Sequence, residues 1–322
     1  MANEMKFKRY EVKFKITRSQ YENLQDELRE HMIPDEHGRS TILSLYFDTP
    51  DFRLIRKSME HPDYKEKLRL RSYGVVEEGQ PVFLELKKKY DKVVYKRRIE
   101  MTEAGAVDFC RQSSGEQYTS WNYRLHDQAE SDPDRKTESY SDRQIKKEIR
   151  YALQFYPNLK PRMLLSYERE AWYEKGNHDF RITFDQNLLW RETDLDLHTG
   201  VFGKHIIPED EIIMEVKTGM GIPLWLTAIL TREKIYKTSF SKYATAYRQK
   251  VVAEMAEKAF EATVEQLLEE HAAPSRHATG PDKQIVASIG QAAVPFKEER
   301  RVREIFRGIR KRSHLIGGRK YA

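Results

Sequence analysis

Charged and apolar residues alternate along short segments of this chain. In residues 67–71 every second residue is Lys or Arg, and the residues between them are leucines. Residues 85–89 place Glu85, Lys87 and Lys89 in the same alternation. Because successive side chains of a β-strand point to opposite faces, each segment predicts a strand with one charged face. The leucines on the opposite face must be buried against another part of the protein.

The same alternation recurs along the first two thirds of the chain. An antiparallel sheet with its charged face in water would explain any single strand of this kind. Solvated faces usually mix Ser, Thr, Asn and Gln with charge, however, whereas these faces carry mainly Lys and Arg. Eight strands are predicted, at residues 7–16, 44–48, 67–71, 85–89, 92–101, 163–174, 179–187 and 211–219.

A sheet with one cationic face would repel itself if it stayed open. A closed barrel can direct that face inward around a ligand and its apolar face outward toward helices. The predicted fold class is therefore α+β, an eight-stranded antiparallel β-barrel with a charged interior that is covered by amphipathic helices. Helical spacing and proline positions predict these helices at 18–32, 103–112, 141–155, 223–230 and 239–270, and a turn or helix start around Pro50.

Composition restricts the class of protein. The chain has 322 residues, of which 34% are charged and 11% aromatic, as in a soluble globular protein. We see no apolar run of the roughly 18 residues that a membrane span needs, and no signal peptide. Cys110 is the single cysteine, which excludes a disulfide framework and a cysteine-based zinc site. We therefore expect a cytoplasmic protein.

The net charge of +6 is unevenly distributed. Residues 296–320 carry a surplus of seven positive charges, so the rest of the chain is close to neutral. We expect one main domain at 1–250 whose last helix continues to about 271, a linker at 272–295 and a basic helical tail at 296–322. The tail could pack on the domain, or bind a polyanion, a membrane protein partner or an anionic membrane surface, which would make the protein peripheral at the membrane.

Basic side chains that converge in a partly dry interior need an anionic partner. Arg and Lys match phosphate oxygens well, so a linear polyanion is the predicted ligand. Carboxylates among them would either hold a divalent metal or neutralise their basic neighbours, and both interpretations stay open. The glycine-rich phosphate loops and the H-E-x-x-H metal motif are missing.

Nine short motifs, in order along the chain, resemble the VTC domain. That domain forms the polyphosphate polymerase branch of the triphosphate tunnel metalloenzymes, which are CYTH-like proteins. The resemblance implies an eight-stranded tunnel, and synthesis of inorganic polyphosphate from ATP with Mn²⁺ or Mg²⁺. The motifs lie at 10–14, 45–49, 65–74, 83–89, 94–98, 166–172, 181–185, 214–217 and 239–243.

The resemblance also implies site residues. The basic tunnel residues that take part in catalysis would be Lys13, Arg69, Arg71, Lys87, Lys96, Arg98, Arg169 and Lys242. The metal would be bound by Glu215, with Glu85 and Glu11 as further acidic ligands. We expect further residues in or beside these motifs to bind substrate, namely Lys15, Lys67, Lys89, Tyr167, Arg181, Lys217, Ser241 and Tyr243.

Two other functions remain open at this point. A tunnel triphosphatase would use Glu11 or Glu85 to activate water. Relatives of that kind begin with Glu-x-Glu-x-Lys, whereas this chain has Glu11-Val-Lys13, which favours the polymerase branch. A non-catalytic module for polyphosphate or RNA is the other alternative. Only Tyr73 and Tyr167 could stack on bases, so we expect no sequence-specific nucleic acid among the partners.

Overall fold

The computed structural model describes residues 10–91, 93–114 and 139–270. The chain divides into two compact units, Met1–Tyr247 and Arg248–Ala322. The first unit contains all the strands found among the described residues, and the described part of the second is helical. The predicted linker and basic tail lie outside the described residues, as does most of the polar segment that follows residue 114.

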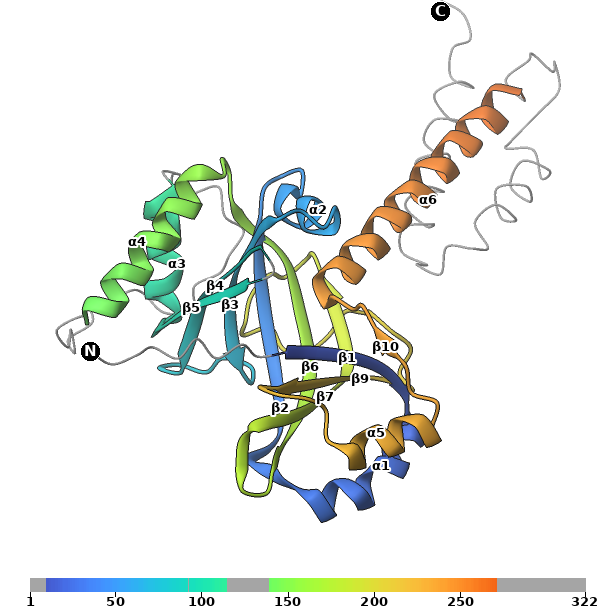
Figure 1. Ribbon diagram of the computed structural model, residues 1–322. Coiled ribbons are helices and arrows are strands. Elements are labelled where there is room, and N and C mark those ends of the chain that lie inside the picture. The colour runs from blue at the N-terminus through green and yellow to red at the C-terminus, as the bar shows by residue number, and fades with distance from the viewer. Residues whose placement is uncertain (1–9, 92, 115–138, 271–322) are drawn as a thin grey trace, which may run out of the picture. The chain divides into compact units, whose positions relative to one another are not determined.

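The first unit is built on one antiparallel sheet (Figure 1). Each of the eight predicted strands overlaps one long strand of this sheet, so the predicted strand positions are confirmed. Their bounds are β1 (Tyr10–Thr17), β2 (Met32–Asp48), β3 (Tyr64–Tyr73), β4 (Pro81–Tyr90), β5 (Val93–Thr102), β6 (Lys160–Glu174), β7 (Asn177–Arg191) and β9 (Glu211–Thr218). Two short strands, β8 (Lys204–His205) and β10 (Lys237–Thr238), complete the sheet.

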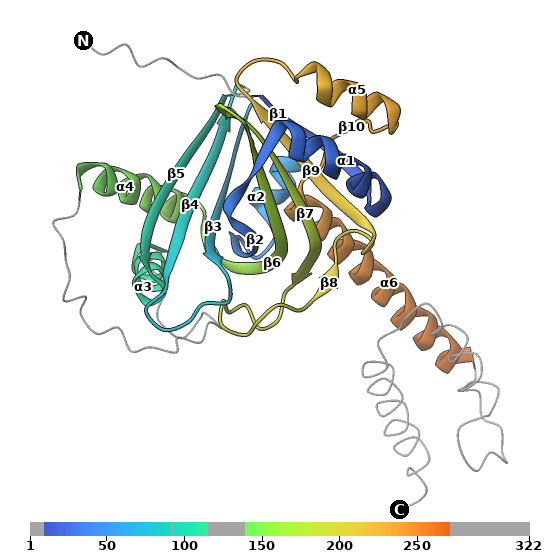
Figure 2. The same cartoon turned by 90° about the horizontal axis from the view of Figure 1, so that it is seen from below.

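The sheet is not closed by hydrogen bonds, in contrast to the predicted barrel. Its strand order is β10-β1-β9-β7-β6-β2-β3-β4-β5, with β8 paired to β7. Within the described residues, β5 pairs only with β4, and the other end of the sheet is β10. The sheet nevertheless curls strongly, as the view in Figure 2 shows. The prediction of an α+β antiparallel fold is thus confirmed, whereas a closed eight-stranded barrel is not formed.

The helices occupy the predicted segments. Thr17 ends β1 and begins the next helix through a capping box, in which its hydroxyl accepts the Gln20 N–H and the Gln20 side chain accepts the Thr17 N–H. Pro50 lies in the turn before a helix that starts at Arg53, whose N–H donates to the Thr49 hydroxyl. The helices are α1 (Arg18–His31), α2 (Arg53–Met59), α3 (Glu103–Ser114), α4 (Tyr140–Phe155), α5 (Leu224–Arg232) and α6 (Lys242–Glu270).

Helices cover the apolar face of the sheet in two groups (Figure 1). Leu68 and Leu84 of strands β3 and β4 pack in one buried cluster with residues of α3 and α4, such as Cys110 and Leu153. A second cluster joins the apolar residues of β1, β7 and β9 to α1 and α5. Burial of this apolar area drives the curled sheet together, at about 25 cal/mol per Å². No described helix is long and apolar enough to cross a membrane.

The charged face of the sheet is its concave side. Glu11 on β1 lies near enough to Lys87 on β4 to sense its charge, although these strands are far apart in the sheet order. Burial opposes ionisation of the Glu11 carboxyl, but Lys13 and then Lys87 hold its pKa below the usual value. Curling therefore brings the basic side chains of distant strands toward a common space.

Candidate functional site

A buried carboxylate organises the basic residues on strands β3, β4 and β5. Glu85 is only 1% exposed, and both of its oxygens face cations. Arg69 Nε lies 2.7 Å from Oε2, Lys96 Nζ lies 2.9 Å from Oε1, and Arg98 Nε and Arg71 Nη1 follow at 3.6 and 3.9 Å. We call these five residues the Glu85 cluster. Strand register explains it, because Arg69 and Arg98 are the direct neighbours of Glu85 on either side.

The electrostatics of the Glu85 cluster follow from this crowding. Burial alone would raise the pKa of the Glu85 carboxyl, but Arg69, Arg71 and Lys96 together lower it to about 2. The Arg98 guanidinium is also held from its other side. It lies 3.6 Å from the centre of the Phe83 ring and donates to the Tyr73 hydroxyl at 3.3 Å. The cluster thus presents cations whose orientation is fixed by their neighbours.

A second cluster lies on β1, β6, β7, β9 and the start of α6. Arg169 makes a two-point ion pair with Asp185, with Nε–Oδ1 at 2.6 Å and Nη2–Oδ2 at 2.7 Å. Lys242 also donates to Asp185, and its Nζ lies 3.5 Å from Glu215 Oε1. Lys13 Nζ lies 3.0 Å from the same Glu215 oxygen. We call these five residues the Asp185 cluster.

The carboxyl groups of the Asp185 cluster are ionised despite their burial. Burial disfavours the charged form of Glu215, but Lys242, Lys13 and Arg169 lower its pKa well below the usual value. Lys242 and Arg169 lower the pKa of Asp185 in the same way. Buried ion pairs contribute little net stability, so such a group in a concave face indicates a role in binding.

Tyr167 connects the two clusters. Its hydroxyl accepts a hydrogen bond from Arg71 Nη2 at 3.2 Å. Lys242 Nζ lies 4.6 Å from the centre of its ring, and the Arg169 guanidinium 5.3 Å. Cations of both clusters therefore meet around one aromatic side chain, and a single extended anion could contact both.

Lys67 and Lys87 continue the basic surface near Glu11. Lys67 donates to the hydroxyl of Ser241 at 3.2 Å, which ties β3 to the residue that precedes α6. Burial, with the nearby charge of Lys87, lowers the pKa of Lys67 to about 8. Farther along the face, Arg181 lies opposite Lys217, and Lys217 lies opposite Glu11 on the other side. These residues extend the charged face beyond Glu215.

Three of the residues predicted to bind substrate have neighbours outside the two clusters. Lys15 is half exposed and forms an ion pair with Glu211 at 2.7 Å. Lys89 lies beside Lys65. Burial lowers the pKa of Lys65 most, and the positive charge of Lys89 lowers it further. Tyr243 is buried and donates its hydroxyl to Asp48 at 2.8 Å, so it supports the site from behind.

Sequence reasoning assigned no role to Tyr46 or Asp48. Tyr46 is the direct neighbour of Arg69, accepts its hydrogen bond at 3.0 Å and stacks on Tyr243 with ring centres 4.3 Å apart. Asp48 is fully buried and accepts the N–H groups of Leu54 and other residues at the start of α2. The alternation of Ser44, Tyr46 and Asp48 on one face was the signal that could have placed them.

The face offers oxygen ligands for a divalent cation near Glu215. Lys13 is the direct neighbour of Glu215, so Glu11 lies two residues from that pair on the same face. Thr183 is opposite Glu215 on β7, and its buried hydroxyl has no hydrogen-bond partner within the described residues. Carboxylate and hydroxyl oxygens suit Mg²⁺ or Mn²⁺. Glu85 has four cations around it and Glu215 has three, so a metal at either position would displace some of these ion pairs.

The arrangement can bind a chain of phosphates. The basic groups of the two clusters outnumber their carboxylates, and phosphate oxygens would add ligands to cations that are already oriented. Such fixed charges stabilise negative charge in a transition state without reorganising during the reaction. Phosphoryl transfer depends mainly on positioning and charge, and this face supplies both.

Comparisons with known proteins give a family. The model of a family described as the VTC domain matches residues 8–251, which is nearly the whole first unit. A candidate adenylate cyclase from Bacillus halodurans is similar at 14% identity, with a TM-score of 0.41 over 72% of this chain and 92% of that chain. A candidate adenylyl cyclase from Hippeastrum, described as having a dominant triphosphatase activity, aligns at 15% identity, with a TM-score of 0.38 over 73% and 94% of the two chains. No curated protein matches the chain significantly.

Proposed function

Because this chain belongs to the VTC domain family, we propose that it is a polyphosphate polymerase that uses ATP. A terminal oxygen of a growing inorganic polyphosphate chain attacks the γ-phosphorus of ATP. The bond from that phosphorus to the β–γ bridging oxygen breaks, and ADP leaves. The substrates are then ATP and polyphosphate, and no sequence-specific nucleic acid is involved.

The convergence of basic groups on Tyr167 carries this proposal. Arg71 reaches its hydroxyl from the Glu85 cluster, while Arg169 and Lys242 face its ring from the Asp185 cluster. A triphosphate and an acceptor phosphate could therefore lie end to end along one surface. Alignment of two reactants in this way can lower a barrier by roughly 7–11 kcal/mol.

The residues have distinct roles in the proposed reaction. Phosphate oxygens are held through the paired N–H donors of four arginines, Arg69, Arg71, Arg98 and Arg169. In the transition state the γ-phosphoryl group is only loosely bonded to the attacking and the leaving oxygen. Positive charge near this group would come from Lys13, Lys96 and Lys242. Glu215, with Glu11 beside it, would hold the Mn²⁺ or Mg²⁺, which neutralises phosphate charge when bound.

The charge state of the acidic residues favours transfer to phosphate over hydrolysis. A triphosphatase needs a carboxylate that accepts a proton from water. Lowered pKa values make Glu85 and Glu11 weak bases, since neighbouring cations stabilise both carboxylates. The acceptor oxygen of polyphosphate is already ionised and requires no base. This difference supports the polymerase over the alternative of a tunnel triphosphatase.

Electrophoresis of the products tests the proposal. The purified chain is incubated with ATP and Mn²⁺ or Mg²⁺, and long products are digested with an exopolyphosphatase. A polymerase yields a ladder that the exopolyphosphatase removes, together with ADP. Release of inorganic phosphate without a ladder would instead identify a triphosphatase, and tight binding of polyphosphate without ATP turnover would identify a binding module.

Two adjacent arginines on β5 provide a matched pair of variants. Arg98 belongs to the Glu85 cluster, whereas Arg97 points to the other face and pairs with Glu148 at 3.0 Å. Arg98→Gln should reduce polymerisation by at least about a hundredfold, in line with the loss of one preorganised charge contact. Arg97→Gln should stay close to the unchanged chain. Equal effects of the two substitutions would contradict the assignment of the polymerisation site to the concave face.

A further inference from the structure

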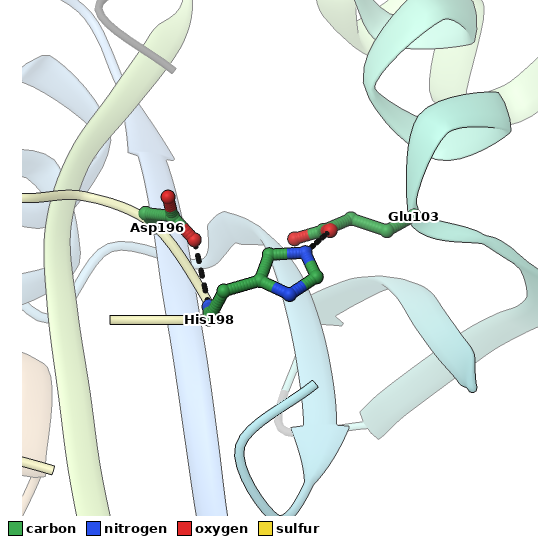
Figure 3. Close-up of side chains that lie close together, drawn as sticks. All are labelled: Glu103, Asp196 and His198. Carbon is green, nitrogen blue, oxygen red and sulfur yellow. Dashed lines mark hydrogen bonds and ion pairs between the residues drawn. The ribbon is translucent and has the colours of Figure 1, made fainter. Parts of the chain in front are cut away.

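A histidine and two carboxylates meet away from the two clusters of the concave face. Glu103 is the first residue of α3, and Asp196 and His198 lie in the loop that connects β7 to β8. Figure 3 shows the His198 ring directed at the Glu103 carboxylate, with Asp196 on its other side. One donor atom of each residue lies within 4.8 Å of the others. Sequence reasoning assigned no role to any of the three.

The three side chains are well shielded from water. Glu103 and Asp196 are 7% and 4% exposed, and the His198 side chain is 14% exposed. Nε2 of His198 contacts a Glu103 oxygen directly, and its backbone N–H donates to Asp196 Oδ1 at 2.6 Å. Leu197, between the two loop residues, is fully buried in the core that also contains α3. Both loop residues are therefore fixed in place opposite the helix.

Hydrogen bonds from Arg191, the last residue of β7, hold this loop. Its guanidinium donates to the carbonyls of Asp194, Asp196 and other loop residues at 3.0–3.2 Å, and to the Thr199 hydroxyl at 2.8 Å. The loop returns to the sheet at Gly203, where a Cβ would lie 2.4 Å from the Trp190 carbonyl oxygen. A loop fixed at so many points presents its side chains in a defined geometry.

The donor set distinguishes a metal site from a simple ion pair. Imidazole nitrogen with carboxylate oxygens is a typical zinc ligand set, at about 2.0–2.2 Å from the ion. Donor atoms within 4.8 Å of one another need only small side-chain rotations to share such an ion. A Zn²⁺ ion at this position would balance the charge of both carboxylates. The concave face has no imidazole among its named members, so the two sites would prefer different metals.

We propose that Glu103, Asp196 and His198 form a zinc site that fastens the β7–β8 loop to the start of α3. The zinc ion would have a structural role, because α3 packs against the strands at the open edge of the sheet. Zinc there would stabilise β4 and β5, which carry the acid and two of the cations of the Glu85 cluster. The proposal depends on these three residues alone and is independent of the polymerase assignment.

Metal content of the full chain tests the site. The protein is purified, exposed to Zn²⁺, dialysed, and measured by mass spectrometry of the metal. We expect about one zinc ion per chain, loss of most of it in His198→Gln, and retention in His205→Gln, whose histidine is half exposed and pairs with Glu209. Glu215→Gln should also retain zinc. Circular dichroism confirms that each variant is folded, and Glu103→Gln serves as a second ligand variant.

Two further readouts separate a metal site from an ion pair. Co²⁺ in place of zinc should give visible d–d absorption in the unchanged chain and none in His198→Gln. A chelator should lower the melting temperature of the unchanged chain by several degrees and leave that of the variant unaltered. Absence of bound zinc in the unchanged chain, or equal zinc in His198→Gln, would mean that the cluster is only an ion pair and would refute the proposal.

Discussion

Arg169 and Asp185 face each other as direct neighbours on β6 and β7, and two hydrogen bonds of 2.6 and 2.7 Å join them. The pair fixes the plane of the guanidinium, while its Nη2 also lies 3.6 Å from Glu215. A fixed guanidinium loses little freedom when a phosphate binds. Asp185 is therefore a positioning residue for Arg169, and for Lys242 as well.

Asp185→Asn should weaken the protein in two ways. The buried cations lose one negative partner, which typically costs about 3–5 kcal/mol of folding stability. Arg169 also loses its orientation, so polymerisation should fall even in samples that remain folded. Urea unfolding measures the first effect and initial rates at saturating ATP the second. Addition of tripolyphosphate should restore part of the stability, since phosphate replaces the missing charge; a variant that polyphosphate fails to stabilise would count against this role.

Glu85 should make stability depend on acid pH. The pKa of its carboxyl in the folded chain is about 2, below the usual value of 4.5. A lowered carboxyl pKa contributes stability above pH 4.5, and that contribution is lost as the pH falls from 4.5 toward 2. In this window the free energy of unfolding should decline by on the order of 1 kcal/mol per pH unit more in the unchanged chain than in Glu85→Gln. Denaturant titrations at several pH values give both slopes, and parallel slopes would show that Glu85 is not held ionised by its neighbours.

The strands and their charged faces were predictable because alternation is a local property of the sequence. A period of two places Lys67, Arg69 and Arg71 on one face whatever the tertiary structure. Which residues meet across that face depends on strand order and curl, which no local pattern contains. The pairing of Arg169 with Asp185 and the contact of Arg71 with Tyr167 are of this kind.

Closure of the sheet was predicted wrongly for a related reason. Electrostatic repulsion favours a curled cationic face, but a curl that brings β1 near β4 already provides the shared space, without a hydrogen-bonded seam. The cluster of Glu103, Asp196 and His198 was also invisible in the sequence. Glu103 lies more than ninety residues before the other two, and the hydrogen bonds of Arg191 that hold their loop follow no local pattern.

Phosphate affinity should fall as the pH rises through 8. Burial and nearby lysines lower the pKa of Lys67 to about 8, so the group loses its charge above that value. Tyr46 changes in the same direction, because the charges of Arg69 and Lys67 outweigh its burial and bring its pKa down to about 8. Above pH 8 the face thus loses a cation and gains a phenolate, and both changes weaken anion binding.

Calorimetric titration of tripolyphosphate without metal, between pH 7 and 9, measures this effect. The unchanged chain should bind several-fold more weakly at pH 9 than at pH 7. Lys67→Met and Tyr46→Phe should each reduce the difference, and the double variant should remove it apart from the titration of the ligand itself. A pH dependence that is unaltered in the double variant would assign the effect to other groups.

Tyr243→Phe tests whether the buried hydrogen bond from Tyr243 to Asp48 stabilises the site. Its hydroxyl donates to Asp48, a fully buried carboxyl whose burial raises its pKa and whose hydrogen bonds oppose that rise. Removal of the hydroxyl leaves Asp48 with its backbone donors only, so the variant should lose about 1–3 kcal/mol of stability at pH 7. Tyr236→Phe, at a residue that is 75% exposed, is the matched control and should leave the free energy of unfolding unchanged. Because the Tyr243 ring would still stack on Tyr46, polymerisation below the melting temperature should fall less than tenfold, whereas a complete loss would show that the hydroxyl itself contacts substrate.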